Sequence, residues 1–158
     1  MDQCRFESCR GYQIMSHHTK DKGDLGVSAV IFDLTRQGYS ICLPLSEHLP
    51  FDLIMVSPPT FSTRRIQAKY RALKDGVIAV KQASTYSDSN GAHSTPTDLT
   101  SFDGYAIYCP DTSKVYYVPV IEVSDQTAFT LRVDPAKGNS QHVIRYAEMY
   151  ETPERMFQ

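Results

Sequence analysis

Several features that define common protein classes are missing from this chain of 158 residues. No apolar run approaches the roughly 20 residues that a membrane-spanning helix needs. The first residues, MDQCRFESCRGYQ, contain no apolar segment of the kind that a secretory signal requires. We therefore expect an intracellular protein with no part in a membrane.

Cysteine is scarce, and its spacing is uninformative. The four cysteines stand at positions 4, 9, 42 and 109, with no CxxC pair and no spacing typical of a zinc site. In a reducing compartment they are most simply free thiols. Cys42 and Cys109 lie in apolar strand-like segments, which predicts that both are core residues. The other two cysteines, together with His17 and His18, form an alternative metal site that the spacing does not favour.

Size and composition indicate one folded domain. The chain is 41% hydrophobic and 22% charged, which is typical of globular proteins. Its length is sufficient for one hydrophobic core and too short for two of ordinary size. We expect a single domain over residues 1–158, with residues 1–18, which show no clear periodicity, as a loosely held arm.

Basic residues are concentrated in one segment, although the net charge of −2 alone argues weakly against a nucleic-acid partner. Residues 64–81 contain six basic residues and one acidic residue. Such a cluster is typical of phosphate binding, whereas a solvated strand face is the commoner alternative. Lys69 is considered separately below. The other five basic residues are the candidates for DNA contacts: Arg64, Arg65, Arg71, Lys74 and Lys81.

The apolar pattern predicts an α+β fold. A helix is expected from Thr19 to a stop at Gly38, because apolar residues recur there at i, i+4 and i+7. Strand-like patterns follow at residues 39–43, 51–56, 61–71, 77–81, 105–109 and 115–123. Residues 83–101, rich in Ser, Thr and Asp, are predicted to form a long loop, and residues 141–150 a closing helix. That loop is either an ordinary mobile segment or a source of donors for base edges.

Three polar side chains interrupt two of the predicted strands. Asp52 is the second residue of FDLIMV, and Gln67 and Lys69 share one face of the following strand because side chains alternate. A buried unpaired carboxylate is costly, so Asp52 needs a cation, a metal or water beside it. A plain ion pair between Asp52 and Lys69, with Gln67 bonded to a neighbouring side chain, is the simpler alternative.

Together these segments resemble the PD-(D/E)XK nuclease family. Asp52 in PFDLI stands for the family's first acid, and Gln67-Ala68-Lys69 stands for its (D/E)-x-Lys. The similarity extends through KGDLGVSAVIFDL, RIQAKYR and FDGYAIYC, and so covers roughly residues 20–120. This set resembles the branch of cyanobacterial intron-encoded homing endonucleases, which also has Gln in place of the second acid.

The resemblance implies a mixed sheet flanked by helices and metal-dependent hydrolysis of double-stranded DNA. Mg²⁺ or Mn²⁺ would be held by Asp52, the amide of Gln67, the backbone carbonyl of Ala68 and Asp24 of the first helix. Lys69 would stabilise developing charge or orient the attacking water. Asp24 is equally well explained as a charge that favours the helix dipole.

The same resemblance implies a homodimer or homotetramer whose subunits each read part of a pseudo-palindromic site. Two alternatives remain. A Holliday-junction resolvase or a restriction enzyme would keep the site and change the substrate. The second alternative is a catalytically inactive DNA-binding protein. It is suggested by Gln67, which replaces the acid of the family motif, and by Val27, which stands where many relatives have Glu.

Overall fold

The computed structural model describes residues 18–46, 48–89, 91–135 and 144–158. Its main sheet has five strands in the order β1-β2-β3-β7-β8. β3 and β7 are parallel and the other neighbours are antiparallel, which confirms the mixed sheet of the predicted α+β fold. The elements are α1 (His18–Arg36), β1 (Ser40–Cys42), β2 (Leu53–Ser57), β3 (Ser62–Tyr70), β4 (Val77–Lys81), β5 (Ala83–Asp88), β6 (Gly91–Pro96), β7 (Gly104–Cys109), β8 (Lys114–Pro119), η1 (Val120–Glu122), β9 (Ala128–Arg132), η2 (Ala147–Tyr150) and η3 (Pro153–Phe157).

The helix α1 ends where the sequence predicts, and its end fixes the direction of the chain into the sheet. Gly38 has a φ of +85°, a left-handed conformation that suits glycine. The Gly38 N–H donates to the Thr35 carbonyl at 3.1 Å, and the Tyr39 N–H donates to the Leu34 carbonyl at 3.0 Å. This is the Schellman arrangement, in which the helix closes on itself while Tyr39 and Leu34 pack together in the core.

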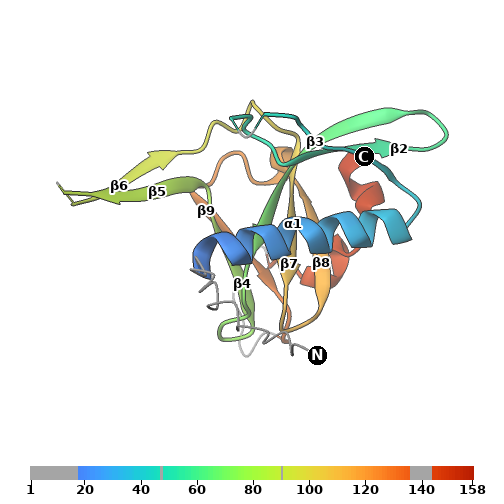
Figure 1. The fold of residues 1–158 in the computed structure, drawn as a ribbon. Helices are drawn as coiled ribbons and strands as arrows, with labels where there is room; N and C mark the ends of the chain where they lie inside the picture. The colour runs from blue at the N-terminus through green and yellow to red at the C-terminus, as the bar shows by residue number, and fades with distance from the viewer. Residues whose placement is uncertain (1–17, 47, 90, 136–143) are drawn as a thin grey trace, which may run out of the picture.

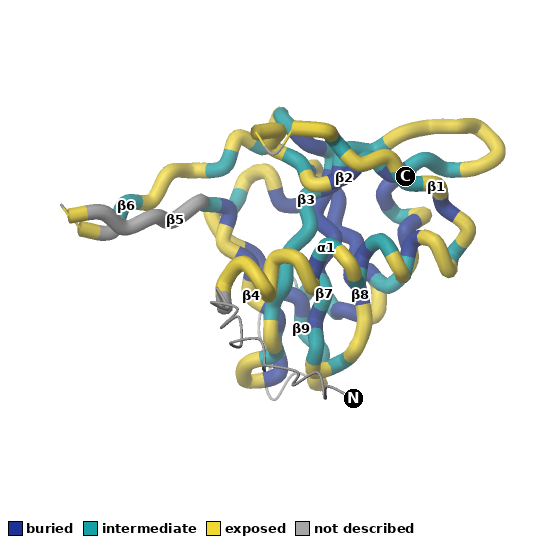
Figure 2. Tube along the Cα trace, viewed as in Figure 1, coloured by how far each residue is buried: buried dark blue, intermediate teal, exposed yellow. Residues whose placement is uncertain are grey.

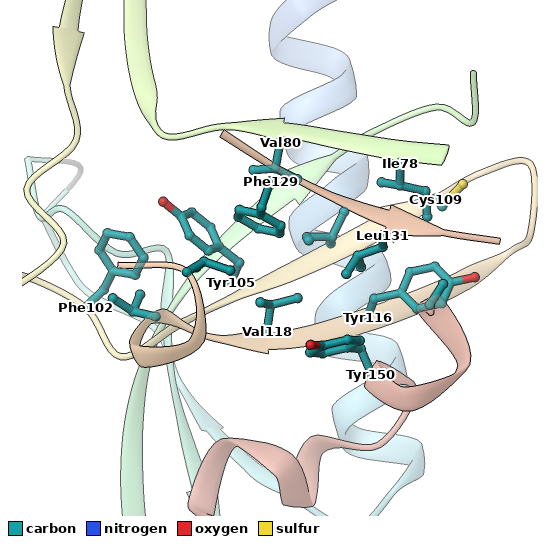
Figure 3. Packing of buried hydrophobic residues seen from close by; sticks show 14 residues of the cluster. Ile78, Val80, Phe102, Tyr105, Cys109, Tyr116, Val118, Phe129, Leu131 and Tyr150 are labelled. Atoms are coloured by element: carbon teal, nitrogen blue, oxygen red, sulfur yellow. The ribbon is translucent and has the colours of Figure 1, made fainter. Parts of the chain in front are cut away.

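The main sheet is covered on both faces. On one face α1 lies across β3, β7 and β8, and Val30 and Leu34 pack there on Ile66 and Tyr117 (Figures 1 and 2). On the other face lies the antiparallel ribbon of β4 and β9. There the side chains of Ile78, Val80, Phe129 and Leu131 meet Tyr105, Ile107, Tyr116 and Val118 of the sheet (Figure 3). Residues of β3 that point away from α1 therefore face the layer of β4 and β9.

The prediction of a loop over residues 83–101 is wrong for most of that segment. β5 and β6 form an antiparallel hairpin in register from Ala83–Pro96 to Asp88–Gly91. The hairpin projects from the body of the molecule (Figure 1). Ser, Thr and Asp are poor indicators of a strand, so the sequence of these segments gave no strand signal although their backbones pair.

Other expectations also need correction. β9 was not predicted, although Phe129 and Leu131 alternate inward along it. Of the closing helix expected over 141–150, residues 141–143 lie outside the described residues, 144–146 are not helical, and only the η2 turn follows. Cys109 is buried as predicted, whereas Cys42 is exposed because β1 lies at the edge of the sheet. None of the helices described is long and apolar enough to cross a membrane.

Candidate active site

Asp52 lies at the point where β2 separates from β3. Its backbone N–H donates to the Ile66 carbonyl at 2.9 Å, one residue out of the register in which Leu53 pairs with Ile66. Its carboxylate then accepts the Ala68 N–H at 2.7 Å, where a further β2 residue would otherwise bond. The sequence prediction placed Asp52 inside the strand; the structure places it one residue before β2 begins at Leu53.

The end of β2 leaves the edge of β3 open beside this carboxylate. In a strand the N–H and C=O of one residue point to the same side, so the Ala68 carbonyl also points toward the open edge. Gln67 donates from Nε2 to the Pro50 carbonyl at 3.4 Å. Its Oε1 atom is buried and has no hydrogen-bond partner in the described part of the chain. A buried acceptor of this kind requires a donor or a cation.

A groove of about 660 Å³ joins this strand edge to α1. Asp24, Asp52 and Ala68 all line it, and Val27 lies in the same wall. Asp24 is beyond the first turn of α1, where Asp21 is the acidic residue. A helix dipole acts mainly within the first turn, so the position of Asp24 fits a role in the groove better than a role at the helix start.

Gly26 allows α1 to lie this close to β3. A Cβ atom at Gly26 would stand 3.3 Å from both the Cβ and the backbone N of Tyr70, and 3.5 Å from the carbonyl carbon of Lys69. Gly23, one turn earlier, has no such neighbour: a Cβ there would meet nothing within 4 Å. Gly26 is therefore the residue that allows Asp24 to lie beside β3.

Gln67 and Lys69 lie on the other face of β3 and do not line the groove. Ile66, Ala68 and Tyr70 face α1, as the alternation predicts, and Gln67 and Lys69 face away. Because β2 has ended, no strand separates Lys69 from Asp52, and each side chain still affects the charge of the other. The predicted residues therefore converge on one strand edge from two faces of the sheet.

Burial acts against the charged form of both Asp52 and Lys69. Burial raises the pKa of the Asp52 carboxyl, although the bond from Ala68 and the charge of Lys69 oppose the rise. Asp52 is exposed as a residue, so the shift reflects protein packed around the carboxyl itself. Burial lowers the pKa of Lys69; the charge of Asp52 opposes this change and Arg71 adds to it. The charged forms of Asp52 and Lys69 therefore lower stability unless a further charged group lies beside them.

The simpler alternative of a direct ion pair between Asp52 and Lys69 is not what the structure shows. The ion pairs within 4.0 Å among the described residues join other side chains, including Arg65 with Asp103 and Lys114 with Glu151.

The basic residues of the segment 64–81 divide into two groups. Arg64 donates from Nε to the Met156 carbonyl at 2.6 Å and lies over the Phe157 ring. Arg65 pairs with Asp103 at 2.8 Å, and Asp103 also accepts the Arg65 backbone N–H at 2.7 Å. Both arginines thus bind other parts of the fold. Apart from Lys69, the others are the half-buried Arg71, which donates to the Tyr70 carbonyl at 2.9 Å, and the exposed Lys74 and Lys81.

The oxygen donors around the strand edge are of the kinds that a hard divalent cation prefers. The carboxylates of Asp24 and Asp52 and the backbone of Ala68 line the groove, whereas the unpaired amide oxygen of Gln67 lies on the opposite face of β3. No group of three or more His, Cys, Asp or Glu side chains with metal-site geometry occurs among the described residues. A metal here would therefore depend on the amide, the carbonyl and water as well as on carboxylates.

The groove also contains residues that the sequence reasoning did not select. Lys20 lies in its wall, one helical turn before Asp24, and the connection from β1 to β2 contributes Leu43, Ser46 and Leu49. The i, i+4 spacing of Lys20 and Asp24 was the available signal for the lysine. The leucines had no signal, because an apolar loop residue resembles a core residue in sequence.

The chain belongs to the PD-(D/E)XK endonuclease family, whose sequence profile matches residues 17–153. Among solved structures, it is similar to a bacterial homing endonuclease, I-Ssp6803I. The two share 18% sequence identity, the match covers 88% of this chain and 92% of that one, and the TM-score is 0.66. These values show a shared fold and confirm the family resemblance seen in the sequence. No curated protein matches the chain.

Proposed function

We propose that this chain is a metal-dependent endonuclease that cleaves double-stranded DNA at a defined site, in the manner of a homing endonuclease. The observation that carries the proposal is the carboxylate of Asp52 at the open edge of β3, beside an unpaired buried amide oxygen of Gln67. Membership of an endonuclease family and the fold shared with a homing endonuclease support it.

Asp52, Gln67, Asp24 and the Ala68 carbonyl would hold Mg²⁺ or Mn²⁺. When bound, the cation would offset charge on the phosphate and lower the pKa of a water molecule. Lys69 would hold its proton beside the scissile phosphate and stabilise negative charge as it develops. Its lowered pKa means that the proton is lost at a lower pH than from an ordinary lysine. Gln67 brings no charge, so we expect weaker metal binding than at a site with a second acid.

The DNA would approach the edge of the sheet at the groove. Arg71, Lys74 and Lys81 are the proposed phosphate contacts that leave room for a ligand, whereas Arg64 and Arg65 would contribute mainly by their charge. The hairpin of β5 and β6 projects from the body, and a two-stranded ribbon fits the major groove of DNA (Figure 2). We propose that it supplies contacts to bases, for which the exposed Ser94 and Thr95 have suitable hydroxyls.

A plasmid cleavage assay tests this function. Supercoiled plasmids carrying a library of genomic fragments are incubated with the wild type, Asp52→Asn and Lys69→Ala, in Mg²⁺ and in EDTA. We expect discrete linear products from the wild type in Mg²⁺ only. Asp125→Asn is the matched control, because Asp125 is exposed and its carboxylate accepts the side-chain amide of the adjacent Gln126 at 3.2 Å.

One observation favours a second candidate, an inactive DNA-binding protein with the same fold. Gln67 replaces the second acid of the family motif and Val27, rather than an acid, lines the groove. DNA binding that is equal in the wild type and Lys69→Ala, without cleavage of any plasmid, would establish that candidate. Cleavage restricted to branched DNA would instead indicate a junction resolvase.

A further inference from the structure

The groove beside the strand edge contains one cation together with its two carboxylates. Of the described residues that line it, Asp24 and Asp52 are acidic and Lys20 is basic. The connection from β1 to β2 adds mainly apolar side chains, among them Leu43 and Leu49. An apolar wall lowers the local dielectric constant, so a charge in the groove acts more strongly than one on an open surface. A ligand that enters the groove therefore meets the charge of Lys20.

The position of Lys20 on α1 is unfavourable for the helix itself. The helix begins at His18, which places Lys20 in the first turn. A positive charge in the first turn opposes the helix dipole. Lys20 also precedes Asp24 by four residues, which is the weaker order for a pair of opposite charges along a helix. The stability of α1 therefore does not account for a lysine at this position.

Within the described ranges, the ammonium group of Lys20 has no protein partner. The residue is exposed, and it forms neither a hydrogen bond nor an ion pair with the described chain. The same helix does contain an ion pair, between Arg36 and Asp33 at 2.9 Å, but none between Lys20 and Asp24. The charge of Lys20 is thus available to an anion in the groove.

We propose that Lys20 binds a phosphate of the DNA strand next to the one that is cleaved, and that it thereby positions the scissile bond at Asp24 and Asp52. This assignment rests on the proposed function and adds a substrate contact on α1. One helical turn, about 5.4 Å, separates Lys20 from Asp24, so the phosphate lies beside the carboxylates and not on them. Lys69 approaches the edge of β3 from the opposite face, so the bound strand has a cation on each side.

The charge of Lys20 has opposite effects on the two ligands of the groove. It attracts a DNA phosphate, and it repels a divalent cation held by Asp24 and Asp52. Replacing Lys20 by alanine should therefore weaken DNA binding, while metal binding stays the same or tightens. A lysine that only supported the shape of the groove would weaken both when removed. The two measurements together separate a phosphate contact from a structural role.

Fluorescence anisotropy of a labelled random-sequence duplex, in Ca²⁺ and over a series of KCl concentrations, measures the effect on DNA. Ca²⁺ takes oxygen ligands and so can offset the carboxylates. We expect Lys20→Ala to bind about threefold to tenfold more weakly, and the slope of log affinity against log salt to fall by about one. Lys20→Arg keeps the charge and should keep the wild-type slope. In calorimetry without DNA, Lys20→Ala should bind Mn²⁺ no more weakly than the wild type, and up to about tenfold more tightly.

Lys22→Ala is the matched control. Lys22 is also exposed on α1, but its Nζ atom lies 5.8 Å from the centre of the Tyr70 ring. It is not among the described residues that line the groove. The variant removes the same charge from the same helix, so the salt slope should stay close to that of the wild type.

An unchanged slope in Lys20→Ala, an equal loss in Lys22→Ala, or no binding of the duplex by the wild type would overturn the proposal. Weaker Mn²⁺ binding by Lys20→Ala would also overturn it, because Lys20 would then support the site itself. The plasmid assay scores cleavage separately. Duplex binding that depends on Lys20, without cleavage, would refute the nuclease function and leave the phosphate contact standing. Cleavage by a wild type whose slope Lys20→Ala leaves unchanged would do the reverse.

Discussion

The Asp52 carboxylate accepts the backbone N–H of Ala68 at 2.7 Å, one residue before β2 joins the ladder. This bond replaces one rung of the sheet with a side chain and holds the carboxylate at an open strand edge. The same position is electrostatically costly, since burial raises the pKa of Asp52. A sheet that needed only stability would continue β2 by one residue, so the arrangement points to chemistry at this edge.

Replacing Asp52 should remove activity without weakening the fold. Asn can still accept the Ala68 N–H, and it carries no charge beside the protein atoms that desolvate the Asp52 carboxyl. The pKa of Asp52 is raised above its ordinary 3.8, so the ionised carboxylate lowers stability above the folded pKa, and this cost disappears as pH falls below 3.8. We expect Asp52→Asn in EDTA at pH 7 to melt no lower than the wild type. A clear fall in melting temperature would indicate a structural role for the carboxylate.

Metal binding should weaken at a higher pH than for an ordinary carboxylate site. A metal ligand must be deprotonated, and the raised pKa of Asp52 means that protons compete earlier as pH falls. Below that pKa we expect about tenfold loss of Mn²⁺ affinity per pH unit. Calorimetric titrations over a pH series measure this. An affinity that stays constant down to pH values near the ordinary carboxyl pKa would contradict the expectation.

Replacing Gln67 by an acid should increase metal affinity and lower the stability of the metal-free protein. Gln67→Glu gives the unpaired oxygen a negative charge, so we expect Mn²⁺ binding to tighten by about tenfold or more. Without metal, the buried carboxylate has no partner, and the melting temperature should fall. Adding Mn²⁺ should recover it. Tighter binding is the decisive result; unchanged affinity would place Gln67 outside the metal site.

Two glycines of α1 form a matched pair. Gly26→Ala puts a Cβ 3.3 Å from backbone and Cβ atoms of Tyr70, so α1 must move away from β3. Gly23→Ala meets nothing within 4 Å and should gain up to about 1 kcal/mol of stability from helix propensity alone. We expect Gly26→Ala to be the less stable of the two by urea unfolding, and its DNA cleavage to fall because Asp24 moves with the helix. Equal stability of the two variants would contradict this account.

Gln82 connects the root of the hairpin to the core. It is 5% exposed, and its Nε2 donates to the carbonyls of Val123 and Gln126, both at 2.7 Å. Its Oε1 accepts from Tyr105 at 3.3 Å. Gln82→Met leaves these groups unpaired and should cost about 2–4 kcal/mol by urea unfolding. A cost below about 1 kcal/mol would show that water replaces the lost bonds.

The sequence predicted the parts of the fold that depend on local patterns. The helix over residues 19–38 followed from its apolar period and Gly38, and the turn at Asp75-Gly76 from residues that accept the positive φ values of 52° and 74°. β9 was missed although Phe129 and Leu131 alternate inward along it. The hairpin was missed because its two segments are rich in Ser and Thr and lack an alternating apolar pattern.

The candidate site was predictable in its residues and not in its geometry. Asp52, Gln67 and Lys69 stood out as polar residues in apolar runs. The geometry depends on where β2 ends, and no local sequence pattern determines that point. The end of β2 decides that Asp52 lies outside the strand and that Lys69 approaches the edge from the other face. Gln82 illustrates the same limit: it stands beside a polar segment that gives no sign of burial, yet it is 5% exposed.

The most direct test of the central claim is calorimetric titration of Mn²⁺ into the DNA-free protein at pH 8, with Asp52→Asn and Asp125→Asn alongside. A site built on Asp52 predicts saturable binding by the wild type and by Asp125→Asn, and none by Asp52→Asn. Absence of binding in the wild type, or equal binding in all three proteins, would contradict a metal site at the edge of β3.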